Sequence, residues 1–154
     1  MRRSTVSVAI ATFNRSAMVK QAIEAALGQT LSPVEVCIAD DASTDGTGTM
    51  LDRLRQAEPK IRVLHQCRNT GGVENWNAAI GMTSGEYIAW CSDDDQFLPD
   101  HLAASVGFMD EHPGIGLVHS SFVDMLETEE GRLQEARTLR FNRPAVLDKE
   151  RLLT

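Results

Sequence analysis

Residues 6–28 read VSVAIATFNRSAMVKQAIEAALG, and this stretch decides the fold class. Its first part, Val6–Thr12, is a run of apolar and β-branched residues, which predicts a buried β-strand. The part that follows places apolar residues at helical spacing between Ser16, which can cap a helix, and Gly28, which can end one. A strand followed at once by a helix is the repeating unit of an α/β protein.

The same alternation continues along the chain. Further strand-like apolar runs lie at Val34–Ala39, Ile61–Gln66, Glu86–Cys91 and Ile115–Met125. Between them, apolar residues recur at helical spacing around Leu51, Trp76 and Val106. Four βα repeats with nearly continuous apolar strands predict a mostly parallel sheet with helices on both faces. We therefore expect an α/β fold, a Rossmann-like three-layer sandwich, whose pattern weakens after Met125.

The composition suits one ordinary globular domain, since 42% of the 154 residues are hydrophobic and 24% are charged. The formal net charge is −7, and we expect no nucleic-acid partner because binding to phosphates needs surplus cations. The cysteines Cys37, Cys67 and Cys91 are widely spaced and form no CxxC pair, which predicts reduced thiols and a cytoplasmic location. No apolar run approaches the length of a transmembrane segment.

Polar clusters follow four of the expected strands. They are Thr12–Arg15, Asp40–Gly46, Asn69–Gly72 and Ser92–Asp95. Ligands of open α/β sheets bind at the carboxyl ends of the strands, so all four clusters would share one edge of the sheet. This coincidence is the strongest indication of function that the residues alone provide.

Asp93, Asp94 and Asp95 form the sharpest of these clusters. Three adjacent carboxylates repel one another unless a cation or solvent compensates their charge. The pattern allows two interpretations: a solvated acidic turn before the next helix, or a Mn²⁺ or Mg²⁺ site in which carboxylates act together with substrate phosphates. The position after a buried strand, beside the other polar strand ends, favours the metal site.

The second cluster matches a calcium-binding loop only in part. Residues 41–46 read DASTDG, but an expected strand rather than a helix precedes them, and an Asp stands at the closing position of the loop. We interpret this cluster as a strand-to-helix loop that caps the next helix, with Asp40 or Asp41 available to hydrogen-bond a base or ribose. The sequence contains no P-loop, nucleophile elbow or HExxH motif.

Four segments, in this order and at these spacings, resemble successive motifs of the family 2 glycosyltransferases of the GT-A fold. They are VSVAIATFNR (6–15), VEVCIADDASTDGT (34–47), NTGGVENWNAAI (69–80) and SGEYIAWCSDDDQFLPDHL (84–102). The resemblance extends from Val6 to about Asp124. It implies a GT-A core at residues 1–125 that binds a nucleotide-diphosphate sugar, most commonly a UDP-sugar, with Mn²⁺ or Mg²⁺ at a DxD-like motif.

The resemblance also implies roles for individual residues. By position, the substrate-binding residues would be Thr12, Asn14, Arg15, Asp40, Asp41, Asn69, Gly71, Asn77 and Asp93. The metal ligands would be Asp94, which we favour, and Asp95. Asp41 would hydrogen-bond the base, and Asp93 would reach the ribose or the sugar.

The chain departs from the common family pattern in two places. Ser92 stands where a first Asp is usual, which leaves one carboxylate fewer, or shifts the working pair to Asp93 and Asp95. An Ala-Arg pair is common where this chain has residues 75–76 (Asn-Trp), so the cation facing the diphosphate would come from Arg15 or Arg68.

The resemblance places the acceptor side downstream. Residues 126–154 would begin an acceptor-side region that continues beyond Thr154. An inverting transfer needs a general base on that side, and Asp124 is only a weak candidate, so we assign no catalytic base. We expect the chain to bind a nucleotide sugar better than it transfers one. The acceptor, whether saccharide, lipid or protein, is unspecified, and peripheral membrane association of a longer protein is compatible with the sequence.

Two other functions stay open at this point. A nucleotidyltransferase also uses metal-binding carboxylates on an α/β sheet, although a glycine-rich basic loop after the first strand would favour it, and residues 13–18 contain no glycine. A non-catalytic nucleotide- or metal-binding module would account for the missing base. Metal-dependent nucleotide binding would distinguish these functions from an acidic domain that binds no ligand.

Overall fold

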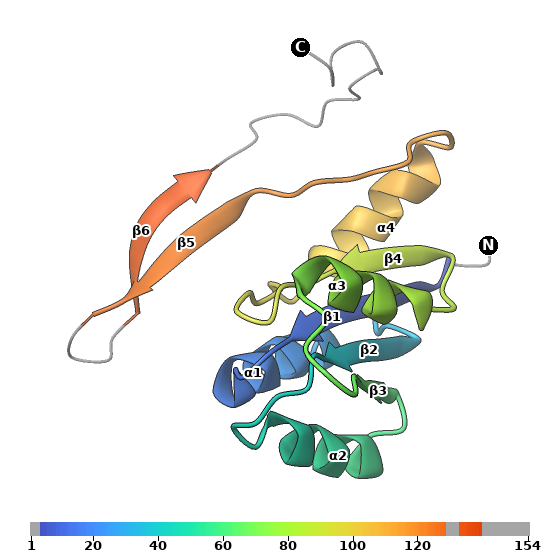
Figure 1. Cartoon of the computed structure of the whole chain (residues 1–154). Helices are drawn as coiled ribbons and strands as arrows, with labels where there is room; N and C mark the ends of the chain where they lie inside the picture. The colour runs from blue at the N-terminus through green and yellow to red at the C-terminus, as the bar shows by residue number, and fades with distance from the viewer. Residues whose placement is uncertain (1–3, 129–132, 140–154) are drawn as a thin grey trace. The chain divides into compact units, whose positions relative to one another are not determined.

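The computed structural model describes residues 4–128 and 133–139, and the chain divides into two compact units, Met1–Asp110 and Glu111–Thr154. Figure 1 shows strands and helices alternating along the first unit. In chain order they are β1 (Val6–Thr12), α1 (Ser16–Leu27), β2 (Glu35–Asp40), α2 (Thr47–Ala57), β3 (Ile61–His65), α3 (Gly72–Gly81), β4 (Tyr87–Trp90) and α4 (His101–Glu111). The four βα repeats predicted from the sequence are confirmed.

The four strands of the first unit form one parallel sheet in the order β3-β2-β1-β4. In its register Thr12 lies beside Asp40, and Asp40 lies beside His65. On the other side of β1, Ala9 lies beside Trp90. The strands therefore end nearly level, and the loops that follow them emerge from the same edge of the sheet. The predicted mostly parallel α/β fold is confirmed.

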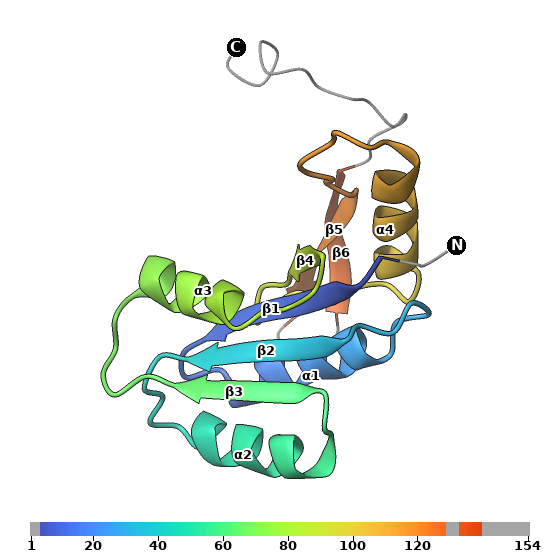
Figure 2. The ribbon, with the colours of Figure 1, turned by 90° about the vertical axis from the view of Figure 1, so that its right-hand side faces the viewer.

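Helices cover both faces of this sheet, and strand residues alternate between the two faces. Val8 and Ile10 of β1 belong to the larger core, which also contains buried side chains of α1, α2 and α4. Ala9 of β1 and Ala39 of β2 face the other way and pack with Ala79 of α3. Figure 2 shows this arrangement, with α3 on one side of the strands and α1 and α2 on the other. Small side chains on the second face let α3 approach the sheet closely.

A buried carboxylate ties the amino-terminal edge of the sheet together. Glu35, at the start of β2, accepts hydrogen bonds from the Ser7 and Ser84 hydroxyls and from the Arg62 guanidinium, the Ser7 and Arg62 bonds each at 2.8 Å. Burial would raise the pKa of Glu35, but these hydrogen bonds outweigh it and lower the pKa from 4.5 to about 2. Gly85 permits the chain beside Ser84 to approach Ser7 closely, since a Cβ at position 85 would lie 2.6 Å from the Ser7 backbone nitrogen. The edge opposite the strand ends is thus held together by hydrogen bonds to the Glu35 carboxylate, which we call the Glu35 hub.

We predict that Glu35→Gln lowers the free energy of unfolding by about 1–3 kcal/mol at neutral pH, because buried donors lose a charged acceptor. Since folding depresses the pKa of Glu35, its contribution is complete above pH 4.5 and disappears as the pH falls toward about 2. Urea unfolding at successively lower pH should therefore show the gap between wild type and variant closing. The exposed Glu86→Gln is the matched control; an equal loss in both variants, or a gap independent of pH, contradicts the role of the hub.

The second unit contains a two-stranded antiparallel sheet of β5 (Phe122–Glu127) and β6 (Leu133–Leu139). The strand predicted over residues 115–125 begins only at Phe122, because Gly116 and the serines at 120–121 interrupt the run of strand-forming residues. The sequence did not predict β6, whose polar composition gives a weak strand pattern. Of residues 126–154, which we assigned to an acceptor-side region, those at 129–132 and 140–154 lie outside the described part of the chain. The boundary at residue 125 stays a prediction.

Candidate active site

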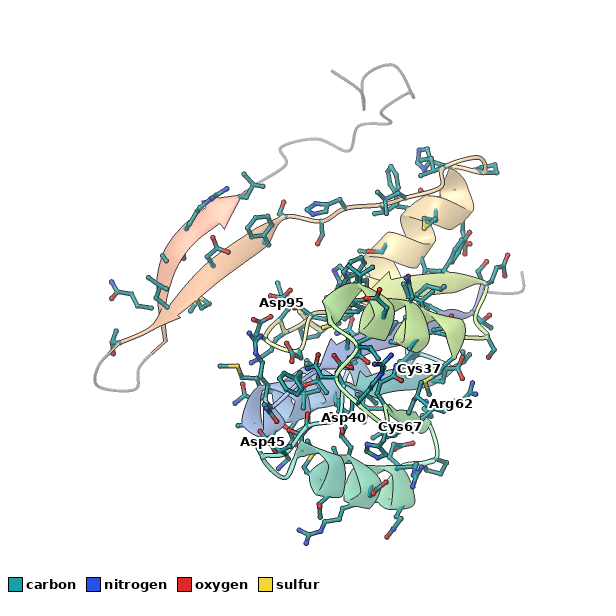
Figure 3. All side chains as sticks on the ribbon, in the orientation of Figure 1. Cys37, Asp40, Asp45, Arg62, Cys67 and Asp95 are labelled. Atoms are coloured by element: carbon teal, nitrogen blue, oxygen red, sulfur yellow. The ribbon has the colours of Figure 1, made fainter. Side chains whose placement is uncertain are left out.

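An open pocket of about 450 Å³ lies at the carboxyl edge of the parallel sheet. The loops after β1, β2, β3 and β4 and the start of α3 all line it. The lining residues are Ala11, Thr12, Phe13, Arg15, Asp41, Asn69, Gly71, Gly72, Asn75, Trp76, Ser92 and Asp93. Figure 3 shows Asp45 and Asp95 at this edge of the sheet and Arg62 at the other. The four polar clusters are therefore brought together as the sequence predicts.

Two carboxylates of the acidic cluster face the same cation. One nitrogen of the Arg15 guanidinium lies 3.0 Å from an oxygen of Asp93 and 2.7 Å from an oxygen of Asp94. The second oxygen of Asp93 accepts a 2.8 Å hydrogen bond from the Thr12 hydroxyl, and the second oxygen of Asp94 accepts a 2.7 Å bond from the Ser92 hydroxyl. Each carboxylate is thus held by a hydroxyl on one side and presents its other oxygen to Arg15.

These contacts set the charge states of the group. The hydrogen bond from the Ser92 hydroxyl is the main cause that holds the pKa of Asp94 below its ordinary value. Burial opposes it, and the Arg15 charge adds a smaller lowering effect. The charge of Asp93 raises the pKa of Arg15. Ser92, which replaces the usual first Asp, is therefore a donor that orients the second carboxylate. The two carboxylates are thus oriented for a cation, and the lowered pKa of Asp94 favours its charged form.

The two carboxylates supply only part of the shell of a divalent cation, and water or a bound ligand supplies the rest. Asp93 is buried and Asp94 is half exposed, and the two oxygens that converge on Arg15 already surround a positive charge. Across residues 4–128 and 133–139, no cluster of three or more His, Cys, Asp or Glu side chains could hold a metal ion. Mg²⁺ commonly takes one or two carboxylates and completes its shell with water and substrate phosphates. The pair therefore suits a cation that arrives with a diphosphate. Asp95 is exposed and does not line the pocket.

Asp41 organises the loop between β3 and α3. One oxygen of this buried carboxylate accepts bonds from the Thr70 amide at 2.7 Å and the Thr70 hydroxyl at 2.9 Å. Its other oxygen accepts the Gly71 amide at 2.9 Å, and Gly71 adopts a φ of 91°, which favours glycine. The Gly71 amide is also 3.1 Å from the Asn69 side-chain oxygen. Asp41 thus fixes the backbone that forms one wall of the pocket.

We predict that Asp41→Asn exposes this loop to exchange, because the carboxylate that accepts three hydrogen bonds loses its charge and an acceptor. Hydrogen exchange should show the protection of the Thr70 and Gly71 amides falling, with a loss of about 1–3 kcal/mol for local opening. Thr70→Val, which removes the hydroxyl bond alone, should give a smaller loss. Unchanged protection in Asp41→Asn means that the loop holds its shape without this carboxylate.

Two predicted site residues support the loops without lining the pocket. The side-chain oxygen of Asn14, whose φ is 53°, accepts the Thr44 amide at 2.7 Å and so joins the loops after β1 and β2. Asp40 is buried, and its Oδ2 lies 3.0 Å from Nδ1 of His65. Burial lowers the pKa of His65, but its hydrogen bonds to Asp40 and Asp52 outweigh burial, so that the pKa is raised. A direct contact of Asn14 or Asp40 with a substrate stays a prediction.

Sequence reasoning missed Asn75 and selected Asn77 instead. Asn75 is buried and lines the pocket, whereas Asn77 is exposed and does not. The Asn75 amide nitrogen donates to the carbonyl of Ala39 at 2.9 Å and to that of Thr12 at 3.3 Å, so it joins α3 to the ends of β1 and β2. Its side-chain oxygen is buried without a hydrogen-bond partner. The departure from the common small residue at position 75 was the available signal.

An aromatic pair follows Asn75. Trp76 and Trp90 lie with their ring centroids 4.3 Å apart and their planes tilted by 43°. Trp90 is 61% exposed, and Trp76 lines the pocket. A tryptophan therefore lies where the family pattern commonly has arginine, which makes this wall of the pocket aromatic rather than cationic.

The fold and the pocket define a class of α/β proteins in which ligands bind at the carboxyl ends of the strands, and solved structures share this fold. S. aureus TarS, solved in complex with UDP, is 25% identical with a TM-score of 0.63, and the match covers 79% of this chain and 40% of TarS. A mannosyltransferase from Pyrobaculum calidifontis, solved with GDP-Man and Mn²⁺, has a TM-score of 0.67 at 24% identity, over 75% of this chain and 35% of that one. These neighbours are GT-A glycosyltransferases, which confirms the predicted GT-A fold.

The family model described as "Glycosyl transferase family 2" matches residues 7–152. The chain therefore belongs to glycosyltransferase family 2, as the four motifs indicate. A glycosyltransferase of Nostoc sp. is 29% identical over 134 residues, 86% of this chain and 41% of that protein. Chondroitin synthase of Pasteurella multocida is 34% identical over 95 residues, 62% of this chain and 10% of the synthase. The chain thus spans less than half the length of these relatives. Within the described residues, no helix has the length and apolar character that crossing a membrane requires.

Proposed function

We propose that this chain binds a nucleotide-diphosphate sugar together with Mn²⁺ or Mg²⁺ and forms the donor-binding part of an inverting glycosyltransferase. The observation that carries the proposal is the oxygen pair of Asp93 and Asp94, aimed at one cation beside a pocket of nucleotide size. Support comes from TarS, which was solved with UDP and with UDP-GlcNAc, and from the mannosyltransferase solved with GDP-Man and Mn²⁺. On the TarS likeness a UDP-sugar is the donor we favour.

The pocket offers different chemistry to the two ends of such a donor. Asp41 and the loop from Asn69 to Gly71 would receive the base and ribose, because a carboxylate accepts the N–H groups of a base. The opposite wall, with Asp93 and Asp94, would receive the diphosphate and the sugar. We propose that the donor-binding part comprises residues 1–125 and that acceptor contacts lie mainly beyond it.

The transfer itself breaks the bond between the sugar carbon and the diphosphate oxygen as an acceptor oxygen attacks from the opposite side. A divalent cation held by Asp93 and Asp94 would offset the negative charge that grows on the departing diphosphate. The chain's own residues prepare this: the Thr12 and Ser92 hydroxyls keep both carboxylates oriented, so no reorganisation is needed when charge develops. The general base that takes the acceptor proton stays unassigned.

A cytoplasmic location is consistent with the state of the cysteines. Cys37, Cys67 and Cys91 are free thiols, and Cys37 and Cys91 are buried. Burial raises the pKa of Cys37 to about 11 and that of Cys91 to about 12, so these two thiols are protonated and unreactive. We therefore propose that the chain functions in a reducing compartment.

We predict that calorimetry with UDP and with GDP shows binding of at least one of them that strengthens when Mn²⁺ is present. Asp94→Asn should remove most of this metal effect, a loss of about tenfold or more in affinity, or at least about 1.4 kcal/mol. Asp110→Asn is the control, because Asp110 accepts bonds from Ser4 and Tyr87 away from the pocket.

Absence of binding by wild type in all arms contradicts the proposed function. Metal-dependent binding that survives unchanged in Asp94→Asn contradicts the assigned cation site. A nucleotidyltransferase would instead bind nucleoside triphosphates in preference to diphosphates, and this comparison belongs in the same titration series.

A further inference from the structure

We propose that the Arg15 guanidinium and the divalent cation bind alternately at one site, called the seat, which one oxygen of Asp93 and one oxygen of Asp94 form. The guanidinium contacts both carboxylates until the metal displaces it. The proposal deepens the proposed function, on which the identity of the incoming cation rests. It makes Arg15 a positioning residue that competes with the metal, whereas the family resemblance implies that Arg15 lines the nucleotide pocket and is a candidate to face the diphosphate.

The four oxygens of the two carboxylates form two pairs with different partners. Thr12 holds the inner oxygen of Asp93 at 2.8 Å, and Ser92 holds one oxygen of Asp94 at 2.7 Å. The two oxygens left over converge on a single nitrogen of Arg15, at 3.0 and 2.7 Å. Hydroxyl anchors on the outside and one shared cation between the carboxylates form a seat for a single positive charge.

The seat holds only one cation at a time. Mg²⁺ needs carboxylate oxygens at about 2.0–2.1 Å, and a guanidinium nitrogen within hydrogen-bonding distance of the same two oxygens occupies that volume. Two positive charges so close would also repel strongly. Because the anchored oxygens already face Thr12 and Ser92, the carboxylates cannot turn to serve both cations without breaking those hydrogen bonds.

The displaced guanidinium has room to move toward the pocket. Arg15 is the N-cap residue of α1, its side chain is 47% exposed, and it lines the pocket. It can therefore turn from the carboxylates toward an anion in the pocket without unpacking a core. A diphosphate there would attract both the seated metal and the released guanidinium. Metal and nucleotide should thus bind with positive coupling, part of which passes through Arg15.

The test compares Mn²⁺ binding, without any nucleotide, to wild type and to Arg15→Gln by calorimetry. If the guanidinium competes for the seat, its removal strengthens Mn²⁺ binding by roughly three- to tenfold, the size expected for losing two partly exposed ion pairs. A gain of affinity with an unchanged circular dichroism spectrum cannot come from a misfolded variant. Arg53→Gln, exposed on α2 away from the pocket, removes the same charge and should change Mn²⁺ affinity by less than twofold.

A second readout follows the guanidinium itself. In wild type, the side-chain nitrogen NMR signals of Arg15 should be those of a hydrogen-bonded guanidinium, and adding Mg²⁺ should shift them to a freely rotating one with the same midpoint as metal binding. Equal Mn²⁺ affinity in wild type and Arg15→Gln overturns the proposal. An Arg15 signal that does not change at saturating Mg²⁺ overturns it as well, and so does a gain of the same size in Arg53→Gln.

A nucleotide arm separates this proposal from the function on which it rests. With UDP or GDP present, the gain from Arg15→Gln should shrink or reverse, because the nucleotide then loses the guanidinium as a partner. If wild type binds neither nucleotide, the proposed function fails, but the metal-only titration still decides whether Arg15 competes for the seat. If wild type binds the nucleotide with metal and Arg15→Gln behaves identically in both arms, only the exchange proposal fails.

Discussion

Parallel pairing of β1 with both β2 and β4 is the constraint on which the site depends. It places Thr12 beside Asp40 and carries the chain after Trp90 to the level of Thr12, so that a hydrogen bond can join Thr12 to Asp93 across 81 residues of sequence. Burial of both sheet faces fixes the register, because a slip by one residue would turn the alanines of one face toward the larger core. The Glu35 hub secures the opposite edge.

The site is built from acidic side chains that already have donors. Asp41 accepts the backbone of the loop after β3, Asp40 faces His65, and Asp93 and Asp94 share Arg15. In a chain of net charge −7, these donors let several carboxylates lie close together at one edge of the sheet. Trp76, which contacts Trp90, adds an aromatic side chain to the lining of the pocket.

The order of strands and helices could be predicted because buried parallel strands and amphipathic helices leave strong local patterns. The edge at which ligands bind followed from topology alone. Helical spacing does not say which of two nearby polar residues points at the sheet, so only the departure from the family's common Ala at position 75 could have indicated Asn75. A substrate contact of Asn77 stays a prediction. The contacts of Arg15 with Asp93 and Asp94 could not be predicted, because they depend on a side-chain rotamer and on carboxylates 78 and 79 residues away.

The most direct measurement is an anomalous difference map from crystals of this chain grown with Mn²⁺ and a nucleoside diphosphate. The account predicts a manganese peak between the converging oxygens of Asp93 and Asp94, phosphate oxygens completing its shell, and the Arg15 guanidinium turned from the carboxylates toward the diphosphate. A peak bound elsewhere, or a nucleotide seated in the pocket with Arg15 still between the two carboxylates, would contradict it.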